Sequence, residues 1–203
     1  MRKFEIGHEF LKHGRKSVTV VAVLLSGCVA RATYHWYVPQ ADWGTPGRQA
    51  GSSGPTPTIN LVRSEFPPFT VQIYMQTEPH RKRGGSHPSD SPTLVMLMFK
   101  SGGFHVDSER WKQAQMTPVR MRATSNRVEA HLDDGKKLVY EVPELQGELT
   151  FVGTRTDHKI EVELKGLQPQ SFTLLVPSFM VNGEPLKTGP IKYRYEQTRQ
   201  WVH

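Results

Sequence analysis

The sequence predicts an all-β fold, an antiparallel β-sandwich with at most one short helix, and three observations predict it. After residue 59, apolar residues alternate with polar ones in short runs that recur about every ten residues. Glycine and proline contribute 17 and 15 of the 203 residues, which provides many turns. No segment between the runs has the pattern of a long crossover helix, so consecutive strands are expected to be antiparallel.

The first strands of this predicted domain have two different patterns. From Phe69 to Gln76, apolar residues alternate with polar ones, which predicts a strand with one buried face. The segment Leu94 to Phe99, "LVMLMF", is apolar on both faces and predicts a central strand covered on both sides. Pro92 and Gly102 bound it too closely for a helix. The single short helix is expected near residues 108–115.

The later runs continue to the C-terminus. Their inward positions are Val119, Met121 and Ala123; Val128, Ala130 and Leu132; Leu138, Tyr140 and Val142; Leu149 and Phe151; Ile160, Val162 and Leu164; Phe172, Leu174 and Val176; and Ile191, Tyr193 and Tyr195. Asp133-Asp134-Gly135 predicts a tight hairpin turn, and Asn182-Gly183 marks a second turn. Roughly eight to ten strands at this spacing favour an immunoglobulin-like architecture, with a small barrel as the alternative.

The segment before residue 59 is expected to lie outside the sandwich. Residues 39–58, "PQADWGTPGRQAGSSGPTPT", are rich in proline and glycine and lack apolar periodicity, which is typical of a flexible spacer. We therefore assign residues 28–58 to a linker and residues 59–203 to the domain. The aromatic cluster that ends at Tyr37 is expected either to rest at a lipid interface or to pack on the domain.

An apolar run near the N-terminus, from Val18 to Ala30, follows a basic segment and contains the only cysteine of the chain. The uncharged window from Ser17 to Ala30 is shorter than the roughly 20 residues that a membrane-spanning helix needs. A basic start, a short apolar run and small residues at its end are typical of an export signal. Residues 1–27 are therefore predicted to be a signal peptide, and a buried element with Cys28 in the core is the alternative.

The end of this run, Leu25-Ser26-Gly27-Cys28, resembles the lipobox of bacterial prolipoproteins at all four motif positions. The resemblance implies cleavage between Gly27 and Cys28 and a covalent lipid on the Cys28 thiol, with no other cofactor expected. A thiolate is the strongest nucleophile among the side chains, which accounts for the cysteine. Because Val29 rather than Asp follows, the resemblance implies the outer membrane with the domain facing the periplasm, or the cell membrane if there is only one.

The charge pattern argues against a nucleic-acid partner. The net charge is +7, but the densest positive run is the short His80-Arg81-Lys82-Arg83. Arg81, Lys82 and Arg83 lie in a predicted loop, residues 79–92, and are candidate contacts for an anionic membrane surface. The alternative interpretation is that this segment is a solvated loop that does not contact a membrane.

The sequence contains neither a nucleophile elbow nor a phosphate-binding glycine loop, and we assign no catalytic or metal-ligating residue. Two classes of function stay open. The first is a non-catalytic, lipid-anchored module that binds an envelope protein through a strand edge or a set of loops. The second is a periplasmic enzyme or metal carrier, whose site would be assembled from dispersed residues such as His105, His131, His158, Asp107 and Glu129.

Overall fold

The computed structural model describes residues 30–49, 56–77, 91–100, 109–153, 157–167 and 170–202. The chain forms two compact units, and nearly all of the described elements belong to the unit made of His35–Glu78 and His87–Gln197. The predicted signal peptide, Cys28, and the basic residues Arg81, Lys82 and Arg83 lie outside the described residues. Among the residues that are described, no helix has the length and hydrophobicity needed to cross a membrane.

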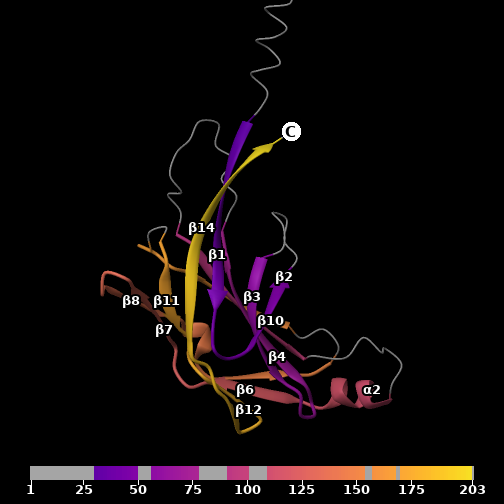
Figure 1. Ribbon diagram of the computed structural model, residues 1–203. Coiled ribbons are helices and arrows are strands. Elements are labelled where there is room, and N and C mark those ends of the chain that lie inside the picture. Colours follow the sequence, from indigo (N-terminus) through magenta and orange to yellow (C-terminus); the bar gives the residue numbers. More distant parts are fainter. Residues whose placement is uncertain are drawn as a thin grey trace, which may run out of the picture. The chain divides into compact units, whose positions relative to one another are not determined.

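The strands form three sheets, whose arrangement Figure 1 shows. The first sheet has the order β1 (Ala30–Gln40), β14 (Pro190–Val202), β11 (Phe172–Leu175), β7 (Arg127–Leu132) and β8 (Lys137–Glu141). The second has the order β10 (Asp157–Glu163), β5 (Thr93–Lys100), β4 (Phe69–Gln76), β3 (Thr56–Arg63) and β2 (Thr45–Gln49). The third has the order β13 (Glu184–Leu186), β12 (Phe179–Val181), β6 (Val119–Ala123) and β9 (Glu148–Phe151). The helical elements described are α2 (Glu109–Met116) and the 3-10 turn η1 (Pro143–Leu145).

The predicted fold class is confirmed, since the sheets are antiparallel, the described part of the chain contains one short α-helix, and the layers of sheet are consistent with a β-sandwich. Antiparallel registers join β2 to β3, β3 to β4, β4 to β5 and β5 to β10, and likewise β14 to β11, β11 to β7 and β7 to β8. The strands divide among three sheets, whereas an immunoglobulin domain has two. Each sheet in the described part of the chain is open at both edges, so the small-barrel alternative is not adopted.

The core is built from the inward faces of the strands, as the alternation predicts. In the first sheet, the residues that are at most 1% exposed include Val128, Ala130, Phe172, Leu174, Ile191 and Tyr193. These side chains pack with the inward residues of the other two sheets in one cluster, to which Ile73 and Met96 of the second sheet and Phe179 of the third belong. The period-two pattern of these segments therefore identified their buried faces correctly.

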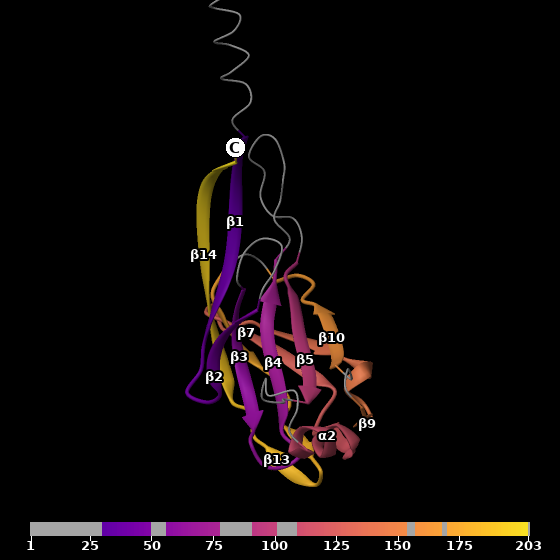
Figure 2. The same ribbon diagram turned by 90° about the vertical axis from the view of Figure 1, so that its right-hand side faces the viewer.

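The prediction of a half-buried strand at β4 is wrong, because both of its faces are buried. Its polar residues Thr70 and Gln72 are buried along with the apolar ones. Figure 2 shows β4 between β3 and β5, and in this central position each polar side chain has neighbours on both sides. The Gln72 side-chain amide donates to Asn60 Oδ1 on β3 at 3.1 Å, which offsets part of the cost of its burial. The central position predicted for β5 is confirmed, since it lies between β4 and β10.

The predicted linker is wrong for residues 30–49 and 56–58, because β1 and β2 are strands of the first and second sheets and β3 begins at Thr56. Tyr37 of β1 is 4% exposed, and its ring packs against those of Phe172 and Tyr195 at centroid separations of 5.6 and 5.5 Å. Of the two placements expected for the aromatic cluster, packing on the domain is therefore observed for Tyr37. The side chains of Thr58 and Asn60 of β3 lie against Gly47 of β2, so a Cβ at this position would have to displace them.

Both predicted turns are observed. The turn at Asp133-Asp134-Gly135 joins β7 to β8, and Gly135 has the positive φ of 85° that this turn needs. The turn at Asn182-Gly183 joins β12 to β13, with φ of 51° and 83° at its two residues. Positive φ at both central residues is the geometry that favours Asn-Gly in two-residue hairpins.

The buried hydroxyl of Tyr193 provides a test of this core. It has no hydrogen-bond partner among the described residues, and burial raises the pKa of Tyr193. An unsatisfied buried hydroxyl costs about 1–3 kcal/mol. We therefore expect Tyr193→Phe to raise the free energy of unfolding by about 1 kcal/mol, measured by urea denaturation. A loss of stability in this variant would show that the hydroxyl has a partner that stabilises the fold.

Candidate binding groove

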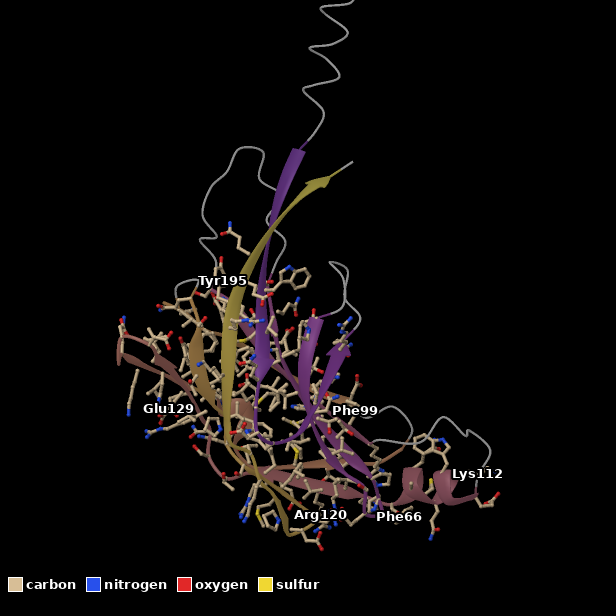
Figure 3. All side chains as sticks on the ribbon, in the orientation of Figure 1. Phe66, Phe99, Lys112, Arg120, Glu129 and Tyr195 are labelled. Atoms are coloured by element: carbon tan, nitrogen blue, oxygen red, sulfur yellow. The ribbon has the colours of Figure 1, made fainter. Side chains whose placement is uncertain are left out.

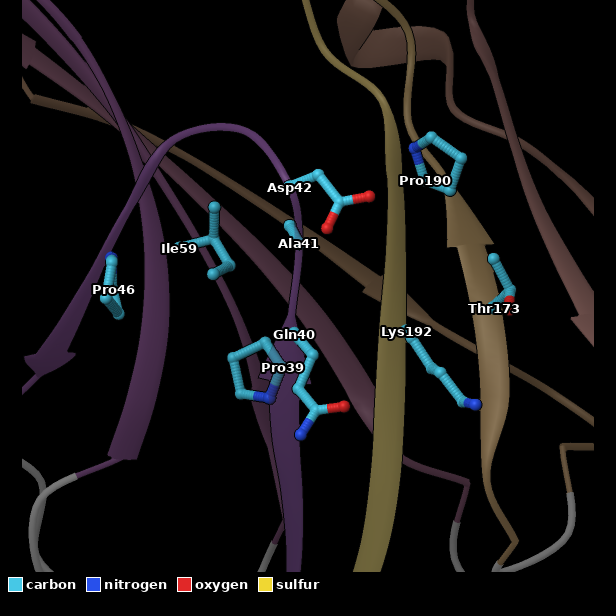
Figure 4. A pocket seen from close by; sticks show the side chains of 9 residues that line it. All are labelled: Pro39, Gln40, Ala41, Asp42, Pro46, Ile59, Thr173, Pro190 and Lys192. Atoms are coloured by element: carbon cyan, nitrogen blue, oxygen red, sulfur yellow. The ribbon is translucent and has the colours of Figure 1, made fainter.

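A groove of about 530 Å³ lies where the turn after β1 meets β14 (Figure 4). Its volume is within the range of small-molecule pockets. The residues that line it are Pro39, Gln40, Ala41, Asp42, Pro46, Ile59, Thr173, Pro190 and Lys192. They come from β1, the β1–β2 turn, β2, β3, β11 and β14, so the first and second sheets both contribute.

Trp43 holds one wall of the groove in place. Its indole Nε1 donates to the Pro190 carbonyl oxygen at 3.0 Å, which joins the β1–β2 turn to the start of β14. A Cβ on Gly189 would lie 2.6 Å from the indole ring, so only glycine leaves room for this contact. Gly44 adopts a positive φ of 73° in the same turn. Glycine at these two positions therefore permits the turn to pack closely on its neighbours.

The polar lining carries charges of both signs. Neither the Asp42 carboxylate nor the Lys192 ammonium forms an ion pair within the described part of the chain. In Figure 4 the side chain of Asp42 points toward β14, whereas that of Lys192 lies on the other side of this strand, near Thr173. Both charges are therefore available to a ligand in the groove.

The apolar lining consists mainly of prolines. Pro39, Pro46 and Pro190 present ring carbons and no backbone N–H group. Ile59 is nearly fully buried and forms an apolar base between them. An apolar side chain of a ligand can lie on this surface, while polar groups beside it reach the charged residues.

The dispersed residues considered for an enzyme or metal site are in different places. His131 Nε2 lies 3.0 Å from Glu129 Oε2, and both residues are on β7 of the first sheet. His158 is on β10 of the second sheet. His105 and Asp107 lie outside the described residues. None of the three described residues lines the groove, and the described part of the chain brings no three metal-ligating side chains together.

Two partly buried cations have structural roles. Lys100 Nζ donates to the carbonyl oxygens of Ala114, Gln115 and Thr117 at the C-terminal end of α2, at 3.3, 3.0 and 2.7 Å. These hydrogen bonds satisfy carbonyl groups that have no partner within the helix. Burial lowers the pKa of Lys100. Arg63 donates to the Val181 carbonyl oxygen at 2.9 Å and to Glu184 at 2.7 Å, which ties β3 to the β12–β13 hairpin.

No motif in the sequence marks the groove. Asp42 and Pro46 belong to the segment that was assigned to a linker, and Lys192 comes from the far end of the chain. Comparison of the chain with protein-family models, with curated proteins and with solved structures finds no match. The function proposed for the groove therefore rests on its own geometry.

Proposed function

We propose that this protein is a lipid-anchored envelope lipoprotein whose β-domain is a non-catalytic binding module. The lipobox resemblance of Leu25-Ser26-Gly27-Cys28 supports the anchor, with cleavage after Gly27 and lipid on Cys28. More than one acyl chain on a single cysteine makes attachment effectively permanent, since each buried CH₂ contributes about 0.8 kcal/mol. The resemblance favours the outer membrane, with the domain facing the periplasm, and Arg81, Lys82 and Arg83 are then available to anionic headgroups.

The groove supports the binding function. It combines the unpaired charges of Asp42 and Lys192 with the apolar surface formed by Ile59 and the prolines. A short, extended segment of an envelope protein matches this chemistry, because it can place an apolar side chain on the prolines while its backbone N–H and C=O groups stay free for polar contacts. Gln40 and Thr173 provide side-chain hydrogen-bonding groups on the two sides of β14.

Site-specific photocrosslinking in living cells tests this proposal. With a photoreactive residue in place of Lys192 or Thr173 in the full-length chain, we expect ultraviolet light to give the same discrete adduct from both positions. Lys112 on α2 is the matched control, since it is exposed and does not line the groove. Adduct patterns that are identical at Lys192 and Lys112 would contradict a partner in the groove.

A further inference from the structure

The strand β8 is the outer edge of the first sheet. It pairs with β7 on one side, and no other described strand pairs with it. Figure 1 shows β8 at the margin of the sheet, with no described element beyond it. An open edge presents unpaired backbone N–H and C=O groups to any strand that approaches it.

The hydrogen bonds to β7 determine which residues of β8 face this open edge. The Leu132 N–H donates to the Lys136 carbonyl oxygen at 2.8 Å, and the Val142 N–H donates to the Asn126 carbonyl oxygen at 2.7 Å. Hydrogen-bonded pairs alternate along an antiparallel ladder, so the even-numbered residues between these two ends bond to β7. The backbone groups of the odd-numbered residues, Lys137, Val139 and Glu141, therefore point away from the sheet.

The side chains of these three residues are complementary to a second copy of the same strand. In an antiparallel pair centred on Val139, Lys137 of one copy lies opposite Glu141 of the other, and Val139 lies opposite itself. Val139 is 52% exposed, although its side chain is apolar. The same register places Leu138 opposite Tyr140 on the other face, and both are apolar and partly buried.

We propose that two copies of this chain pair through β8, edge to edge, as a two-fold symmetric dimer. The pairing joins the first sheet of one copy to the first sheet of the other. It forms about six backbone hydrogen bonds, from Lys137, Val139 and Glu141 of each copy. Moving the register by two residues places Val139 opposite a charged residue, so the sequence specifies one register. This inference goes beyond the groove and does not depend on the lipid anchor.

The charges at this edge specify the partner. Charged side chains on an edge strand normally oppose pairing with other chains. Here Lys137 and Glu141 disfavour pairing with most strands, because few strands place opposite charges at both positions. A second β8 does so, since in the antiparallel pair its Glu141 lies opposite Lys137 and its Lys137 lies opposite Glu141. Glu141 also pairs with Arg127 of β7 at 2.7 Å, so its carboxylate lies between that guanidinium and the partner's ammonium.

Charge reversal with rescue tests the proposal in the full-length chain by sedimentation equilibrium. We expect the wild type to form a concentration-dependent dimer. The dimer dissociation constant is expected to rise about tenfold for Lys137→Glu and for Glu141→Lys, because each change creates two like-charge pairs. The double variant K137E/E141K restores opposite charges at both pairs and is expected to dimerise again. The control Lys112→Glu makes the same charge change on α2, across the molecule from Glu129 of the first sheet (Figure 3), and is expected to leave the dimer unchanged.

Val139→Pro separates loss of pairing from loss of folding. The Val139 N–H points away from β7, so proline removes a donor to the second copy and none from the β7–β8 ladder. We expect this variant to be a monomer whose circular dichroism matches that of the wild type. A wild-type chain that stays monomeric at every concentration, or a dimer that none of these changes weakens, would overturn the proposal. Association only with a different protein would overturn it as well.

Discussion

Replacing Tyr37 by alanine is expected to lower the free energy of unfolding by about 3 kcal/mol. The ring is 4% exposed and packs against Phe172, Tyr193 and Tyr195 at centroid separations of 5.6, 6.5 and 5.5 Å. These neighbours belong to β11 and β14, whose pairing holds their backbones in place. They cannot collapse fully into the space that the ring leaves, so the cost of a cavity adds to the lost burial. Guanidinium denaturation measures the change.

Gln40→Ala is the matched control for this prediction. Gln40 lies on the same strand, but its side chain is exposed, so the change in stability is expected to stay within about 0.5 kcal/mol. Equal stability of Tyr37→Ala and Gln40→Ala would mean that the segment is the spacer its composition indicates. A large difference between them shows that β1 is part of the folded domain.

The sequence was most informative where local signals determine the structure. The β7–β8 hairpin is an example, since alternation fixes the inward faces at Val128 and Ala130, and Asp134-Gly135 fixes the turn. The Asn182-Gly183 hairpin follows from the same kind of local chemistry. Such elements are recognisable because the residues that determine them lie next to each other in the chain.

The N-terminal strands could not be recognised in this way. The partner of β1 is β14, near the other end of the chain, and the prolines and glycines of β2 match the composition of a spacer. Proline is tolerated there because β2 is an edge strand of its sheet. Both faces of β4 are buried. The burial of Thr70 and Gln72 likewise depends on neighbouring strands and not on the residue pattern of β4 itself.

The residues of the groove likewise come from distant parts of the chain. Asp42 and Lys192 are separated by 192 − 42 = 150 residues, and neither stands in a motif. In the β8 edge, by contrast, the symmetric order of Lys137, Val139 and Glu141 is visible in the sequence. This order predicts pairing only in combination with the structure. The topology shows that β8 has an open edge, and the hydrogen bonds to β7 show which residues face that edge.

Replacing Cys28 by serine is expected to abolish lipid attachment completely. Lipid transfer in prolipoproteins forms a thioether, and a serine hydroxyl is a much weaker nucleophile than a cysteine thiolate. Cys28 is the only cysteine in the chain, so no other thiol can replace it. The matched control is Ser26→Ala, which keeps a small residue within the lipobox resemblance and is expected to be lipidated like the wild type.

The proposed anchoring is tested most directly by metabolic labelling with a clickable fatty acid, followed by fractionation of the envelope. The wild type and Ser26→Ala are expected to carry the label and to be found in the membrane fraction. Cys28→Ser is expected to carry no label and to keep its N-terminal segment, because cleavage follows lipid attachment. A Cys28→Ser variant that is still labelled and bound to the membrane would contradict the proposal that this protein is a lipoprotein anchored through Cys28.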